Sequence, residues 1–151
     1  MRRMLAAAAA ALALAGASVA VAGPANARTT ADADVRSTLV VMTGRAERPG
    51  PGDPDGFGFA LVSLTPAEGE ICYVLTASRI EPATAAHIHR GGREVAGPVV
   101  VPLEPPTSGL SAACVTADRG LVTEIAADPE GYYVNVHNAP YPAGAIRAQL
   151  R

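Results

Sequence analysis

The chain has 151 residues, and its twelve basic residues are all arginines, set against fourteen acidic residues for a formal net charge of −2. The arginines form no cluster, so we expect no nucleic-acid partner, because phosphate recognition needs a basic stripe. The length suits one domain built around one hydrophobic core, and we expect no second domain.

The N-terminus has the pattern of a cleaved secretory signal. Arg2 and Arg3 precede an apolar, alanine-rich run, and Ala25-Asn26-Ala27 supplies the small residues of a cleavage site. We therefore predict a signal peptide over residues 1–27 and a secreted or cell-envelope location. A retained membrane anchor is the alternative, but the run is barely long enough to span a bilayer. After cleavage we expect no membrane association.

The rest of the chain reads as short strands separated by Gly and Pro clusters. A flexible lead is expected over 28–36, and a single helical pattern covers 118–127, where Pro129 ends it. This order predicts an all-β fold over 37–151, an antiparallel sandwich or barrel of about seven or more strands with one short helix. The expected strands are 37–43, 57–64, 71–77, 85–89, 98–103, 131–137 and 145–150.

Cys72 and Cys114 are the two cysteines of the chain. Disulfides form and persist in exported proteins, so we predict that these two residues are bridged. A cysteine metal site is the weaker alternative, because two thiols so far apart in sequence lack the close ligand pairs of such sites.

Three histidines lie in strand-like alternation. His87 and His89 share one face of their predicted strand, and His137 shares a face with Tyr133 and Asn135. If the two strands are neighbours, the imidazoles converge, and neutral imidazole suits copper or zinc. The alternative is a metal-free network in which the histidines organise turns by hydrogen bonding.

Three further residues are candidates for positions beside such a site: Tyr133, Asn135 and Arg147. The first two follow from the alternation around His137. Arg147 lies on the face opposite Ile146 and Ala148, where it either lines the polar face and attracts an anion or extends its head into solvent.

Four motifs recur in the order of a known family: AAHIHRG at 85–91, GPVV at 97–100, YYVNVHN at 132–138 and PAGAIRAQL at 142–150. In these motifs the sequence resembles the CHRD domain, which is named for its repeats in chordin. The resemblance implies an all-β, immunoglobulin-like sandwich in a secreted protein, and a small single-domain bacterial member. The growth-factor partner of chordin is not carried over to this chain.

The last motif departs from the family pattern, which resembles Gly-Glu-Ile-Arg-Gly-Gln. Ala145 and Ala148 stand where the Glu and the second Gly are expected. A carboxylate is therefore missing near the predicted polar face.

These observations favour an exported, non-enzymatic binding domain that takes an unknown extracellular ligand, or a copper or zinc ion, through His87, His89 and His137. No catalytic residues are predicted, because no nucleophile or phosphate-binding motif is present. One alternative is a copper-dependent redox enzyme of superoxide-dismutase-like plan, since those enzymes also place a His-x-His on a sandwich strand. Three histidines are too few for their two metals. Another alternative is a structural or adhesive envelope module without metal.

Overall fold

The computed structural model describes residues 34–151, so the predicted signal peptide and most of the predicted lead lie outside the described residues. The described part contains eight strands, one α-helix and two short 3-10 turns. They are β1 (Arg36–Thr43), η1 (Gly44–Ala46), β2 (Phe57–Thr65), β3 (Glu70–Thr76), β4 (Ala83–Arg90), β5 (Val99–Leu103), β6 (Leu110–Thr116), α1 (Arg119–Ala127), η2 (Pro129–Gly131), β7 (Tyr132–Asn138) and β8 (Ile146–Gln149).

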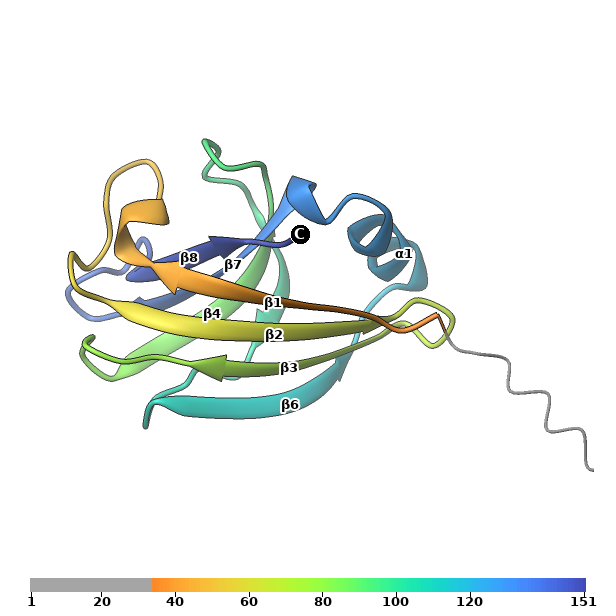
Figure 1. The fold of residues 1–151 in the computed structure, drawn as a ribbon, viewed down its shortest axis with the longest axis horizontal. Helices are drawn as coiled ribbons and strands as arrows, with labels where there is room; N and C mark the ends of the chain where they lie inside the picture. The colour runs from red at the N-terminus through yellow and green to blue at the C-terminus, as the bar shows by residue number, and fades with distance from the viewer. Residues whose placement is uncertain (1–33) are drawn as a thin grey trace, which may run out of the picture.

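All eight strands belong to one antiparallel sheet with the order β5-β4-β7-β8-β1-β2-β3-β6. The sheet curls into a barrel shape (Figure 1). The prediction of an antiparallel all-β fold with one short helix is therefore confirmed, but the division into two immunoglobulin-like sheets is not seen. The reason is that β1 pairs with β2 along its whole length and also meets β8, at Thr43 and Arg147. This pairing joins what would otherwise be two separate four-stranded sheets.

The core lies inside the curled sheet and follows the period of two expected for strands. In β2, for example, Gly58, Ala60, Val62 and Leu64 are buried, while the residues between them are partly or largely exposed. The same alternation in the other strands sends aliphatic side chains from both halves of the sheet into one hydrophobic cluster.

The helix predicted over 118–127 is present as α1. The Asp118 side chain accepts a hydrogen bond from the Leu121 backbone N–H, which caps the first turn. Val122 and Ile125 are fully buried and pack one face of α1 against the core cluster. Among residues 34–151, no helix has both the length and the apolar character needed to cross a membrane.

Strand β6 was not among the predicted strands. Its sequence contains Ala112 and Ala113 in place of the β-branched alternation that marks a strand, so its conformation depends on pairing with β3. Cys72 of β3 lies directly opposite Cys114 of β6, and the two form a disulfide, as predicted.

Candidate metal centre

The three histidines lie on the outer face of β4 and β7, which are hydrogen-bonded neighbours. His87 is opposite Asn135, and His89 is opposite Tyr133. Ile88 and Val134, one residue out of phase, are fully buried on the inner face. The strand alternation therefore directs the imidazoles away from the core and toward one another.

The imidazoles form a compact group. His87, His89 and His137 each offer a ring nitrogen, and these three nitrogens lie within 4.8 Å of one another. The Nδ1 atom of His87 is 3.0 Å from Nε2 of His137. His89 and His137 are buried, while His87 is half-buried and gives the group an approach from solvent.

Two backbone carbonyls determine which nitrogen carries the hydrogen in two of the rings. Nδ1 of His89 is 2.9 Å from the Gly97 carbonyl oxygen, and Nδ1 of His137 is 3.1 Å from that of Pro142. Because a carbonyl only accepts, each Nδ1 carries the hydrogen. In its neutral form the His89 ring then has its lone pair on Nε2, whereas Nε2 of His137 faces a second acceptor oxygen, Oδ1 of Asn135. Nε2 of His89 is buried without a hydrogen-bond partner. Metal-binding histidines have this arrangement, in which the second nitrogen donates to a fixed acceptor.

The electrostatics of the group favour neutral imidazole. Burial, together with the neighbouring rings of His137 and His89, lowers the pKa of His87. Burial also lowers the pKa of His137, against the opposing hydrogen bond to Pro142. Both rings are therefore in the form that coordinates a metal at neutral pH.

Each residue predicted to lie beside the site is on this face. Tyr133 stacks on His89, with ring centroids 4.7 Å apart and an interplanar angle of 7°. Oδ1 of Asn135 is 3.0 Å from Nε2 of His137. Arg147 lies over Tyr133, its guanidinium carbon 3.3 Å from the centre of the ring.

The expectation of a solvent-exposed head for Arg147 is wrong. Only 1% of the residue is exposed. Its guanidinium donates to the backbone carbonyls of Val95 at 2.9 Å and Gly92 at 2.8 Å, because the loop between β4 and β5 folds over this part of the sheet. The guanidinium is thus fixed by protein carbonyls.

A buried carboxylate close to the site was missed by the sequence analysis. Glu47 follows η1 and is 2% exposed. Burial raises its pKa to about 7, against the opposing effects of Arg147 and the Asn135 amide. The carboxyl group fits against Gly144, whose φ is 144° and where an added Cβ would lie 2.4 Å from the carboxyl carbon. Glu47 thus brings a carboxyl group beside Gly144, the residue before Ala145, from a turn far away in sequence.

A second group of potential ligands is chemically unsuitable. Glu70, Cys72 and Cys114 also bring their ligand atoms within 4.8 Å of one another. Both cysteines are bonded in the disulfide, so neither offers a thiolate to a metal.

The fold and the site together define an antiparallel, barrel-shaped β domain with a histidine cluster on its outer face. The model of the CHRD domain family matches residues 38–150, a range that includes all three histidines, and the chain belongs to this family. No curated protein and no solved structure matches the chain.

Proposed function

We propose that this protein is an exported binding domain that holds one copper or zinc ion through His87, His89 and His137. The observation that carries the proposal is the buried Nε2 atom of His89, which has no partner in a cluster of three imidazoles. An unsatisfied buried polar atom costs about 1 to 3 kcal/mol, and a bound ion would remove that cost.

The spacing of the nitrogens supports a single ion. Two nitrogens bound to a tetrahedral zinc at about 2.0 to 2.1 Å are separated by roughly 3.3 Å. The 3.0 Å between His87 Nδ1 and His137 Nε2 is close to that value. All three nitrogens lie within 4.8 Å of one another, which is close enough for the imidazoles to turn toward a single ion.

Three histidine ligands leave a coordination position for an external group, as in exchangeable metal sites. The half-buried His87 is on the side that solvent reaches. We therefore propose that the ion, or the ion together with an extracellular ligand, is what the domain binds. The disulfide and the predicted signal peptide support an extracytoplasmic location.

One observation favours the metal-free alternative, a structural or adhesive module. The 3.0 Å contact between His87 and His137 is also a good hydrogen bond if Nδ1 of His87 carries a hydrogen. In that arrangement the cluster ties β4 to β7 without an ion. This alternative leaves Nε2 of His89 unsatisfied.

Calorimetric titration of the metal-free protein with Zn²⁺ and with Cu²⁺ tests the proposal. We expect about one equivalent to bind, and His89→Ala to weaken binding by about 100-fold or more. Glu70→Gln is the matched control, because it alters the second group of ligand atoms and should leave binding unchanged. Less than about one-tenth of an equivalent at micromolar protein, or binding unaffected by His89→Ala, contradicts the proposal. Superoxide turnover that requires copper and all three histidines would favour the redox enzyme.

A further inference from the structure

The outer surface of the other half of the sheet is apolar. Seven large hydrophobic side chains on β1, β2, β3 and β6 are between 37% and 65% exposed. The register makes them neighbours, since Leu39 is opposite Leu61, Leu61 is opposite Val74, and Val41 is opposite Phe59. We call this surface the apolar face; its residues are Leu39, Val41, Phe57, Phe59, Leu61, Val74 and Leu110.

The apolar face is almost free of charge. The residues between its members on the outward side of these four strands are serine, threonine, alanine and the disulfide-bonded cysteines. Glu70, at the start of β3, is the one charged residue among the outward positions of these strands. A partner surface rich in charge would therefore lose hydration here without gaining ion pairs.

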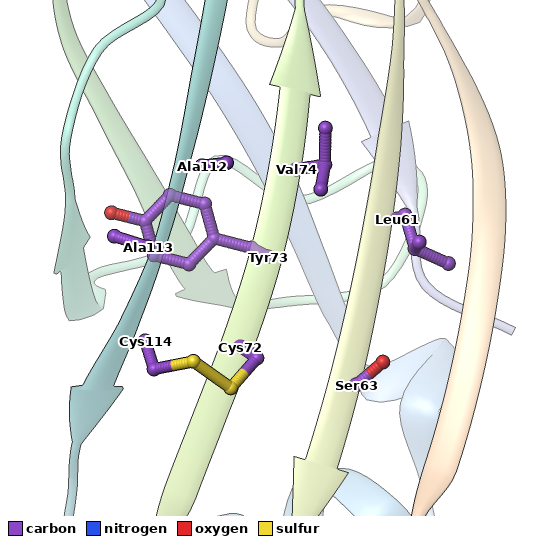
Figure 2. A pocket seen from close by; sticks show the side chains of 8 residues that line it. All are labelled: Leu61, Ser63, Cys72, Tyr73, Val74, Ala112, Ala113 and Cys114. Atoms are coloured by element: carbon purple, nitrogen blue, oxygen red, sulfur yellow. A yellow bond between two sulfur atoms is a disulfide. The ribbon is translucent and has the colours of Figure 1, made fainter.

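The apolar face contains a hollow and, on the same strand β2, a pair of phenylalanine rings. The hollow has a volume of about 330 Å³ and lies over β2, β3 and β6, between Leu61, Val74 and the disulfide (Figure 2). It is open because small residues, Ser63 and Ala112, form part of its lining. Next to it on β2, the rings of Phe57 and Phe59 pack edge to face with centroids 5.0 Å apart.

We propose that the apolar face is the interface between two copies of this chain. A twofold axis between the phenylalanine pair and the hollow brings the phenylalanines of each copy to the hollow of the other, which is the self-complementarity that a symmetric dimer requires. Packing two sheets face to face is a standard way to bury such surfaces.

The exposed area fits a dimer. From their exposed fractions, the seven side chains expose an area on the order of 600 Å². This area is at the upper end of the range for the largest apolar patch on a monomeric protein. A stable interface buries about 800 Å² on each partner. The small side chains around the apolar face supply the rest of this area. The histidines lie on β4 and β7, outside the apolar face, so the dimer leaves both candidate metal centres open.

Analytical ultracentrifugation of the purified chain tests this inference. We expect a dimer at about 100 µM, and Leu61→Glu should raise its dissociation constant by about 100-fold or more, because it buries an unpaired charge at the centre of the interface. Val99→Glu is the matched control. Val99 lies on β5, outside the apolar face, and is 48% exposed, so its replacement should leave the dimer unchanged.

Leu39→Glu provides a second test if Leu61→Glu does not fold, because Leu39 is 65% exposed and has little packing to lose. A wild-type monomer at about 100 µM would overturn the inference, as would a dimer that persists in the folded Glu variants. A monomer that binds phospholipid vesicles would also overturn it, and would assign the apolar face to a membrane surface.

Discussion

Individual buried polar residues determine the charge and the pH dependence of the outer face of β4, β7 and β8. Glu47 is the clearest case, because its carboxyl group is almost fully buried beside Arg147 and Asn135. Burial outweighs these favourable neighbours and raises its pKa to about 7. This carboxyl group therefore changes its protonation near neutral pH while it stays inside the protein.

We predict that Glu47→Gln changes how the stability of the metal-free protein depends on pH. The pKa of Glu47 is about 7 in the folded state and 4.5 in its ordinary, solvated state, so the folded state binds more protons between these values. The contribution of the protonated Glu47 carboxyl group to the free energy of unfolding is complete below pH 4.5. It decreases by roughly 3 kcal/mol as the pH rises through 7.

Glutamine cannot ionise, so the free energy of unfolding of the variant relative to wild type should rise by roughly 3 kcal/mol between pH 4.5 and 8. Urea unfolding across this range measures it. The lowered pKa values of His87 and His137 have the opposite effect on the pH dependence, because they reduce stability as the pH falls below about 6.5. This effect is the same in the variant and in wild type, so it cancels in the difference between them. Parallel pH profiles for the two proteins would contradict the prediction.

Strand alternation was sufficient to predict which side chains share the histidine face. His87 with His89, and His137 with Tyr133 and Asn135, followed from a period of two. Glu47 could not be predicted in the same way, because a turn residue reaches the site only when Gly144 leaves room for it. Which ring nitrogen of His89 carries the hydrogen could not be predicted either, since it depends on a loop carbonyl, that of Gly97.

At the scale of elements, the loop between β4 and β5 is held against the sheet by side chains that bond to its backbone. Arg147 donates to the carbonyls of Gly92 and Val95, and Gln149 donates to that of Gly91. His89 donates to Gly97 further along the same loop. The loop, the stacked Tyr133 and the candidate metal centre are therefore one connected unit.

We predict that Arg147→Lys releases this loop. Lysine keeps the charge but lacks the planar fork that reaches two carbonyls at once. We expect a loss of about 2 kcal/mol in the free energy of unfolding and faster tryptic cleavage after Arg93, which is exposed in the loop. Arg119→Lys, on the exposed start of α1, is the matched control and should leave cleavage after Arg93 unchanged. Equal cleavage rates in the two variants would show that Arg147 does not hold the loop.

At the scale of the whole molecule, local patterns predicted strands and a helix but not how the sheet closes. The two halves of the sheet join where Thr43 pairs with Arg147. These residues are far apart in the sequence, and no local pattern predicts such a contact. The same reason explains β6, whose alanines take strand conformation only against β3. β6 is an end strand of the sheet, and the bond between Cys72 and Cys114 attaches it covalently to β3.

We therefore predict that the double variant Cys72→Ala/Cys114→Ala is less stable than wild type but keeps the fold. The bridge closes a chain segment of 42 residues, and on the chain-entropy model its loss costs about 4 kcal/mol. Urea unfolding should show this decrease, and wild type treated with a thiol reductant should match the variant. Zn²⁺ binding by the folded variant should be unchanged, because β3 and β6 carry none of the histidines. A loss below about 1 kcal/mol would contradict the prediction. It would mean that the pairing of β3 with β6 holds this end of the sheet without the bridge, and that residual β3–β6 contacts restrict the unfolded chain about as much as the disulfide does.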